Sequence, residues 1–223
     1  MTDNPVTLTI DGQPTKAAPG ATILDVARQI GIEIPSLCYE PGLTPQAQCR
    51  LCIVEIEGKP RLEPACASVV TDGMVVHANS DRVLAARRMI LQLLLSEHPE
   101  NCPARALGNE CKLCDYADEF GLQRPAFGFG REREEVAENS FISRNPAACI
   151  LCSKCVRVCD QVQGISALAF NGRGSSTEMR PALSKILDQT DCEMCGNCVA
   201  MCPTGAIMAS QVQGLADAEK VQT

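Results

Sequence analysis

The spacing of apolar and polar residues in the first eighty positions predicts short strands around one helix. The candidate strands are residues 6–10, 13–18, 53–57 and 74–78. Thr22, with Asp25 three residues later, has the pattern of an N-terminal helix cap before an apolar run that ends at Gly31. These elements predict a small α+β unit in which a mixed sheet packs on one helix.

Residues 80–97 have the strongest helical periodicity in the chain. The predicted apolar face consists of Val83, Leu84, Ala86, Met89, Ile90, Leu93 and Leu94. We expect Arg82, Arg87 and Arg88 to lie in solvent, and the helix to join two domains. It should end at His98, because the proline that follows disfavours helical backbone at the residue before it.

The cysteine content indicates a protein that binds metals. The chain has fifteen cysteines in 223 residues, and its N-terminus lacks the basic and apolar pattern of a secretion signal. We therefore expect a reducing, cytoplasmic location, in which the cysteines are ligands and not disulfides.

Charge and hydropathy argue against several other classes of protein. The formal net charge of -7 argues against a nucleic-acid partner. The longest apolar stretch, near residues 89–95, is far too short to span a bilayer. No complete dinucleotide or phosphate-binding fingerprint occurs, and we expect no catalytic residues in the chain itself.

Two cysteine runs near the C-terminal end share the spacing Cys-x2-Cys-x2-Cys-x3-Cys. The first run is Cys149, Cys152, Cys155 and Cys159, and the second is Cys192, Cys195, Cys198 and Cys202. This is the bacterial ferredoxin pattern for two [4Fe-4S] clusters, in which the fourth cysteine of each run ligates the other cluster. The expected ligand sets are Cys149, Cys152, Cys155 with Cys202, and Cys192, Cys195, Cys198 with Cys159.

Four more cysteines lie between the predicted elements of the N-terminal unit. They are Cys38, Cys49, Cys52 and Cys66. Loops held by a sheet can surround a buried anionic centre with backbone N–H groups. Four thiolates satisfy a [2Fe-2S] cluster or a zinc ion equally well by number, so the ligand count leaves both open.

The chain resembles a known family of iron-sulfur modules over most of residues 6–208. The matching segments are 20–24, 34–39, 49–55, 64–66, 140–145, 149–159, 192–198 and 202–207. The family comprises the N-terminal part of the large cluster-carrying subunit of NADH:quinone oxidoreductase, iron-only hydrogenases, NAD-linked formate dehydrogenases and hydrogenase diaphorase subunits. The resemblance implies a β-grasp [2Fe-2S] ferredoxin domain at the N-terminus and favours iron over zinc there.

The family also carries a cluster bound by one histidine and three cysteines, in the pattern His-x3-Cys-x2-Cys-x5-Cys. This chain keeps His98, Cys102 and Cys111, but Arg105 holds the place of the middle cysteine and Cys114 is added. Either the cluster is lost or Cys114 supplies the fourth ligand. The fifteen cysteines and His98 make sixteen donors, which is four sets of four. We therefore expect a [4Fe-4S] cluster on His98, Cys102, Cys111 and Cys114, with a zinc site or an empty site as alternatives.

These patterns divide the chain into four segments. We expect a β-grasp [2Fe-2S] domain at 1–79, a helix with the histidine-containing [4Fe-4S] segment and a connector at 80–139, a 2[4Fe-4S] ferredoxin domain at 140–210, and a tail at 211–223. From Asp115 onward the connector is expected to be rich in loops, with a solvated charged run at 131–135.

The resemblance implies a non-catalytic electron-transfer subunit of an oxidoreductase complex. One [2Fe-2S] and three [4Fe-4S] clusters would pass single electrons between a flavin- and NAD(P)-binding subunit and a catalytic subunit of the formate dehydrogenase or hydrogenase type. Two alternatives differ in observable properties. A free polyferredoxin would purify alone and serve many partners, and a zinc-bound interaction module would be colourless.

Overall fold

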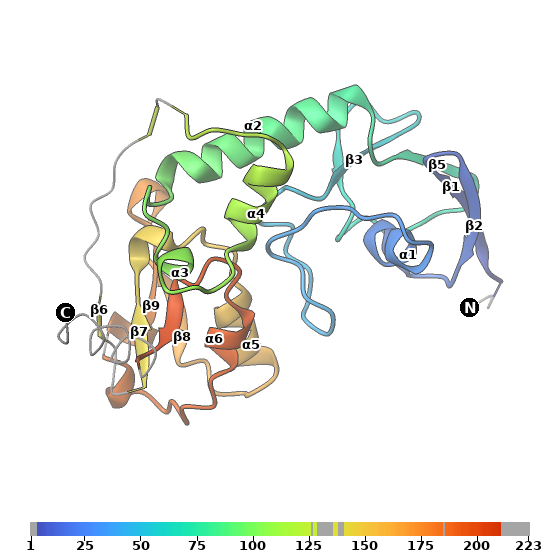
Figure 1. Ribbon diagram of the computed structural model, residues 1–223. Coiled ribbons are helices and arrows are strands. Elements are labelled where there is room, and N and C mark those ends of the chain that lie inside the picture. The colour runs from blue at the N-terminus through green and yellow to red at the C-terminus, as the bar shows by residue number, and fades with distance from the viewer. Residues whose placement is uncertain (1–3, 126, 129–135, 138–140, 185, 211–223) are drawn as a thin grey trace. The chain divides into compact units, whose positions relative to one another are not determined.

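Figure 1 shows a computed structural model of the protein, which describes residues 4–125, 127–128, 136–137, 141–184 and 186–210. The predicted charged run and the predicted tail lie outside these residues. The chain forms two compact units, each described by itself. The first comprises Met1–Tyr39 with Pro45–Leu91, and the second comprises Glu40–Thr44 with Gln92–Thr223.

The first unit is built on a five-stranded mixed sheet. Its elements are β1 (Val6–Ile10), β2 (Gln13–Ala17), α1 (Ile23–Gln29), β3 (Ile53–Ile56), β4 (Glu63–Pro64), β5 (Met74–His77) and the first part of α2 (Asp81–Glu97). The strand order is β2-β1-β5-β3-β4, with β1 and β5 parallel and the other neighbouring pairs antiparallel. The four predicted strands are confirmed, and so is the α+β class with a ferredoxin fold at the N-terminus.

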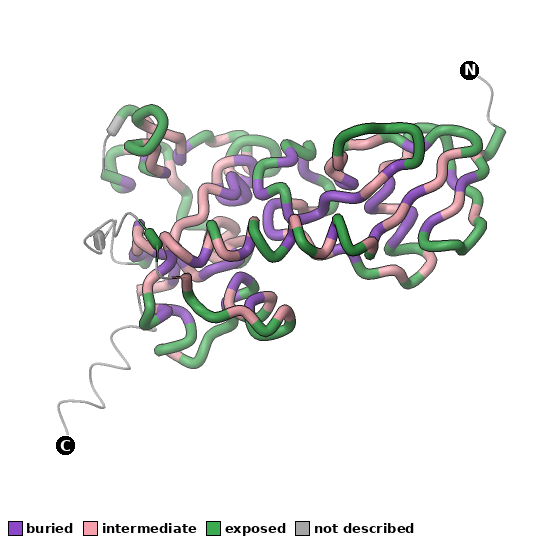
Figure 2. The backbone as a smooth tube through the Cα atoms, turned by 90° about the horizontal axis from the view of Figure 1, so that it is seen from above, coloured by how far each residue is buried: buried purple, intermediate pink, exposed green. Residues whose placement is uncertain are grey.

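Helix α1 begins and ends where the sequence predicts. The Thr22 side chain caps it by accepting a hydrogen bond from the backbone N–H of Asp25 at 3.2 Å. The chain leaves the helix through Gly31, whose φ of 77° lies in the left-handed region that favours glycine. The apolar face of α1 packs on the inner face of the sheet, where Leu8 and Val76 are fully or almost fully buried. Figure 2 shows buried and exposed residues alternating through this unit.

Helix α2 has the predicted length, but the side that it buries only partly overlaps the predicted apolar face. The residues buried along it are Val83, Arg87, Leu91 and Leu95, spaced one turn apart. Met89 and Leu93 are each 53% exposed, so the prediction that they pack inward is wrong. Arg87 is 1% exposed, where solvent was expected, because its Nη2 donates to the carbonyl oxygen of Ile53 at 2.9 Å. Its Nη1 also donates to Asn79 Oδ1 at 3.4 Å, and hydrogen bonds of this kind offset part of the cost of burying a charge.

The second unit combines short helices with two small sheets. After α2 come α3 (Pro103–Ala106), α4 (Lys112–Glu119), β6 (Val136–Ala137), β7 (Ile142–Arg144), η1 (Pro146–Ala148), α5 (Lys154–Gln161), β8 (Leu168–Asn171), η2 (Gly174–Ser176), β9 (Glu178–Pro181), η3 (Ala182–Ser184), η4 (Leu187–Gln189), α6 (Asn197–Met201) and β10 (Ile207–Ala209). The sheets have the strand orders β10-β7-β6 and β8-β9. The expectation of loops from Asp115 onward is corrected by α4, which runs to Glu119. No helix in the described part of the chain is long and apolar enough to cross a membrane.

Candidate metal centres

Four buried thiols of the first unit lie in the loops between its regular elements. Cys38 follows α1, Cys49 and Cys52 precede β3, and Cys66 follows β4. The backbone N–H of Cys49 donates to the Sγ of Cys38 at 3.4 Å. The structure therefore brings these predicted ligands together in a protected site, and a backbone donor is already directed at sulfur.

The four thiols interact as two close pairs. Hydrogen bonding to Cys38, followed by burial, raises the pKa of Cys49, and hydrogen bonding to Cys66, followed by burial, raises the pKa of Cys52. The bond from Cys52 lowers the pKa of Cys66, while the charges of Cys38 and Cys49 oppose that change. Without a cation, these sulfurs cannot all ionise together in so small a space. A bound cationic centre removes this conflict, because it displaces the thiol protons.

Helix α1 fixes the chain just beyond Cys38. The Tyr39 hydroxyl donates to the carboxylate of Asp25, which Thr22 also contacts. The Arg28 guanidinium lies 4.6 Å from the centre of the Tyr39 ring. Burial and the Asp25 carboxylate raise the pKa of Tyr39 to about 12, so the hydroxyl remains a donor at neutral pH. Tyr39, which follows the predicted ligand Cys38, is thus anchored to helix α1.

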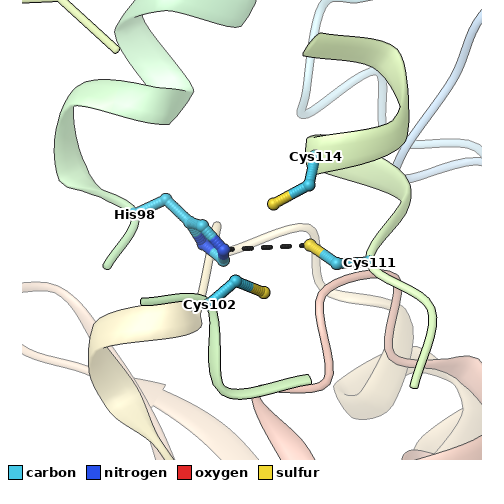
Figure 3. Close-up of side chains that lie close together, drawn as sticks. All are labelled: His98, Cys102, Cys111 and Cys114. Carbon is cyan, nitrogen blue, oxygen red and sulfur yellow. Dashed lines mark hydrogen bonds between the residues drawn. The ribbon is translucent and has the colours of Figure 1, made fainter. Parts of the chain in front are cut away.

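The histidine site is assembled from the ends of three helices in the second unit (Figure 3). His98 follows α2, Cys102 and Cys111 are the N-cap residues of α3 and α4, and Cys114 lies in the first turn of α4. Their ligand atoms all lie within 4.8 Å of one another, with His98 Nε2 3.8 Å from the Sγ of Cys111. No other group of three or more His, Cys, Asp or Glu side chains in the described residues is gathered this closely.

The electrostatics of this site suit a neutral imidazole beside thiolates. Burial lowers the pKa of His98 to about 4, and the positive charges of Arg124 and Arg105 act in the same direction. Burial also raises the pKa of Cys111 and of Cys114. His98 therefore offers a lone pair at neutral pH, whereas the thiols ionise when a metal takes the place of their protons.

Arg105 does not point into the histidine site. Its Nη2 lies 2.6 Å from Asp115 Oδ1 and 2.8 Å from Asp118 Oδ2, and its side chain is 40% exposed. Of the two residues that differ from the family pattern, Cys114 is the one that the structure places with His98, Cys102 and Cys111.

Two small cavities of the second unit are each lined by one of the predicted crossed cysteine sets. Cys149, Cys152, Cys155 and Cys202 line the first, with Phe170 and Met179 among its other neighbours. Cys159, Cys192, Cys195 and Cys198 line the second, with Val158 and Leu187 among its other neighbours. The fourth cysteine of each run thus lies in the cavity of the other run, as the ferredoxin pattern predicts.

The two runs share one backbone conformation. The third and fifth residues of each run have positive φ: 55° at Leu151 and 63° at Ser153, and 54° at Met194 and 76° at Gly196. A helix follows at once in both, beginning at Lys154 and at Asn197. Left-handed residues turn the chain tightly, so three cysteines spaced by three can face one centre. The sequence signals only one of these four positions, through its glycine.

Backbone N–H donors and a buried lysine lie close to the cysteines of these two cavities. The backbone N–H of Ala206 donates to Cys202 Sγ at 3.1 Å, and that of Ala167 donates to Cys159 Sγ at 3.3 Å. Lys154, which is 5% exposed, lies 2.6 Å from Glu40 and lowers the pKa of Cys152 against the stronger effect of burial. Sequence reasoning missed this lysine, because a lysine between Ser153 and Cys155 carries no signal of burial.

Comparisons with known proteins match three consecutive family models. Residues 3–81 match a 2Fe-2S iron-sulfur cluster binding domain, residues 87–126 the NADH-ubiquinone oxidoreductase-G iron-sulfur binding region, and residues 139–208 the ferredoxin-like domain of NADH-quinone oxidoreductase subunit 3. The chain therefore contains both 2Fe-2S and 4Fe-4S binding domains.

Individual proteins similar to this chain are subunits of hydrogenases and of NADH-ubiquinone oxidoreductase. The chain is 41% identical to NADP-reducing hydrogenase subunit HndD of Solidesulfovibrio fructosivorans, over 97% of this chain and 39% of that protein. It is 36% identical to the NADH-ubiquinone oxidoreductase 75 kDa subunit of Reclinomonas americana, over 91% of this chain and 29% of that protein. A chain in the crystal structure of an NAD+-reducing [NiFe]-hydrogenase superposes with a TM-score of 0.83 at 30% identity, covering 92% of this chain and 87% of that one. The chain thus spans well under half the length of these curated relatives.

Proposed function

Because the chain belongs to the family of iron-sulfur modules shared by the NADH-ubiquinone oxidoreductase 75 kDa subunit and NADP-reducing hydrogenase subunit HndD, we propose that it relays single electrons within an NAD(P)-linked oxidoreductase complex. The observation that carries the proposal is the gathering of donor side chains in the second unit, where the ligand atoms of the histidine site lie within 4.8 Å of one another and two cavities are each lined by four cysteines. Together with the four cysteines of the first unit, we assign the fifteen cysteines and His98 to four sets of four.

Each set suits one cluster of the relay. Cys38, Cys49, Cys52 and Cys66 would hold the [2Fe-2S] cluster, and His98, Cys102, Cys111 and Cys114 one [4Fe-4S] cluster. The two crossed cysteine sets would hold the other two [4Fe-4S] clusters. Bound clusters supply one-electron redox steps, while the protein fixes their places and adjusts their potentials through N–H donors and nearby charges.

The partners follow from what one-electron carriers require. A flavin- and NAD(P)-binding subunit would exchange the hydride's two electrons one at a time, and a catalytic subunit of the formate dehydrogenase or hydrogenase type would complete the reaction. The family includes subunits of a hydrogenase and of NADH-ubiquinone oxidoreductase, which supports this arrangement. The proposal includes a cytoplasmic location, since cysteines remain available as ligands in a reducing compartment and do not form disulfides there.

The histidine site has a second candidate occupant. Four ligand atoms within 4.8 Å of one another would also suit a single tetrahedral zinc ion. The match of residues 87–126 to an iron-sulfur binding region favours the cluster.

Metal analysis of protein purified without oxygen tests the ligand sets. We expect roughly fourteen irons and as many acid-labile sulfides per chain, since one [2Fe-2S] and three [4Fe-4S] clusters contain that many. About ten irons with one zinc would support the zinc alternative at the histidine site, and about ten irons without zinc would indicate that this site is empty.

Purification of the native protein together with flavoprotein and catalytic subunits is the expected result for the relay. A brown protein that purifies alone from its native source would instead support a free polyferredoxin.

A further inference from the structure

We infer that Arg105 is a positioning residue of the histidine site, which clamps α4 to α3 so that Cys114 can complete the ligand set with His98, Cys102 and Cys111. The inference rests on the proposed ligand set and adds a role for a residue that does not bind metal. Arg105, which stands at the place of the middle cysteine of the family pattern, would thereby position Cys114, which supplies the fourth ligand instead of that cysteine.

The clamp is a three-residue contact between two short helices. Arg105 lies in α3, and one nitrogen of its guanidinium, Nη2, contacts a carboxylate oxygen of Asp115 at 2.6 Å and of Asp118 at 2.8 Å. Both aspartates lie in α4. Hydrogen bonds to these two carboxylates raise the pKa of Arg105, so the cation persists at any ordinary pH.

The contacted face of α4 is also the face that carries the ligands. Residues three and four apart lie on one side of a helix, so Cys114 and Asp118 are neighbours, and Cys111 at the N-cap lies in line with Asp115. A contact to both aspartates therefore fixes the rotation of α4 about its axis. That rotation determines whether the Cys114 sulfur faces the site.

Neither helix is long enough to hold this geometry alone. α3 has four residues and α4 has eight, whereas isolated helices shorter than about twelve residues are marginal in water. Other contacts do hold the segment: the backbone N–H of Lys112 donates to the carbonyl oxygen of Pro203 at 2.8 Å, and Asn109 N–H donates to that of Ala104 at 2.8 Å. The Arg105 clamp is a side-chain link that joins α3 directly to the first two turns of α4.

The same guanidinium places a positive charge close to the ligands. The Arg105 charge opposes the burial that raises the pKa of Cys114, and it helps to lower the pKa of His98. An electron added to a cluster at this site would be stabilised by that charge and destabilised by the two carboxylates. Removal of an exposed ion pair far from the site would leave the potential of its cluster unchanged, because solvent and salt screen distant charges.

Three variants and one control separate these effects. Arg105→Lys keeps the positive charge but replaces the rigid guanidinium with a flexible, strongly hydrated ammonium group, whereas Arg105→Gln removes both the charge and the clamp. Asp118→Asn keeps an acceptor oxygen but removes a negative charge. Arg82→Gln is the matched control, because Arg82 makes a comparable exposed contact to Glu55 at 3.1 Å in the first unit. Each protein is purified as the full chain without oxygen, and its clusters are titrated by potentiometric EPR and challenged with an iron chelator.

We expect opposite redox shifts from the two charge changes. Arg105→Gln should lower the midpoint potential of the histidine-site cluster, and Asp118→Asn should raise it, while both increase the rate of iron loss from that site. An increase of roughly two- to fivefold corresponds to the loss of exposed ion pairs. Arg105→Lys should restore most of the potential but not the resistance to chelator, and Arg82→Gln should change neither.

Two outcomes would overturn the inference, and a further variant keeps it separate from the proposed ligand set. Unchanged potential and unchanged iron loss in Arg105→Gln would show an ordinary surface ion pair, and so would equal changes in the Arg82→Gln control. Cys114→Ser tests the ligand set itself: if it leaves iron content and EPR spectra intact, the proposed ligand set fails. If Cys114→Ser removes that cluster while Arg105→Gln changes nothing, only the role of Arg105 is wrong.

Discussion

Thr204 and Ala148 are hydrogen-bonded to each other across 56 positions of the chain, with the Thr204 Oγ1 donating to the Ala148 carbonyl oxygen at 2.8 Å. Ala148 immediately precedes Cys149, and Thr204 follows Cys202 by two residues. The bond is buried, because Thr204 is 1% exposed. It therefore ties the two ends of a crossed cysteine set together through the protein itself.

Replacing Thr204 with valine should weaken the crossed site. The change keeps the shape of the side chain but leaves a buried carbonyl without this donor, at a cost of about 1–2 kcal/mol. We expect the [4Fe-4S] absorbance to be lost at a lower guanidinium concentration than in the parent protein. Thr190→Val is a matched control, since its hydroxyl donates only to Leu187 three residues earlier. Equal shifts in both variants would contradict a special role for the long-range bond.

Cys202→Ser should damage the cluster whose other ligands lie more than forty residues upstream. Cys202 lines the cavity of Cys149, Cys152 and Cys155. Low-temperature EPR of the reduced protein should therefore lose or alter that cluster's signal, while the signal of the set that includes Cys195 persists. Cys159→Ser is the reciprocal variant, since Cys159 lines the other cavity. Loss of only the second cluster in Cys202→Ser would show that each run binds its own cluster.

Local signals explain which elements could be predicted from the sequence. The cap of α1 depends on Thr22 and Asp25, which are three residues apart and so within one helical turn. The crossed cysteine sets were predictable for a different reason, because the spacing of both runs matches the ferredoxin pattern in which the fourth cysteine of each run ligates the other cluster.

Long-range partners explain what the sequence could not reveal. Burial of Arg87 depends on the carbonyl oxygen of Ile53, 34 residues away, and no pattern in α2 announces it. Counting ligands led us to expect Cys114 in the histidine site, but the count cannot say where a side chain points, and the structure supplies that placement. The contact of Arg105 with Asp118 was likewise hidden, since the two residues are 13 positions apart and lie in different helices.

Tyr39→Phe should destabilise the N-terminal site selectively. The variant keeps the ring near Arg28 but removes the hydroxyl that donates to Asp25, at a cost of about 1 kcal/mol. We expect faster loss of the [2Fe-2S] cluster to chelator, with the [4Fe-4S] signals unchanged. Because the partner of the lost bond is known, a double-mutant cycle with Asp25→Asn provides the control. Strictly additive effects in that cycle would show that the two side chains do not act through each other.

Glu178 should make the second unit sensitive to acid. Burial alone would raise the pKa of Glu178, but hydrogen bonds from Arg144 and Arg180 outweigh it and keep the pKa below its ordinary value. Arg144 Nη1 lies 2.9 Å from the Glu178 carboxylate, and their side chains are 6% and 16% exposed, so β7 and β9 are joined by a mostly buried ion pair.

The sign of the pH dependence follows from the lowered pKa. The ion pair stabilises the fold fully above the unfolded-state pKa of glutamate, and this stabilisation is lost as the pH falls through the lower folded-state pKa. Glu178→Gln should therefore reduce stability by about 2 kcal/mol at neutral pH, and the difference from the parent protein should shrink below about pH 4. Guanidinium unfolding followed by circular dichroism at a series of pH values measures this difference, and the exposed Glu33→Gln controls for charge. Comparison of variant with parent at each pH cancels the acid lability that their clusters share. A difference that stays constant over the whole pH series would refute the assignment.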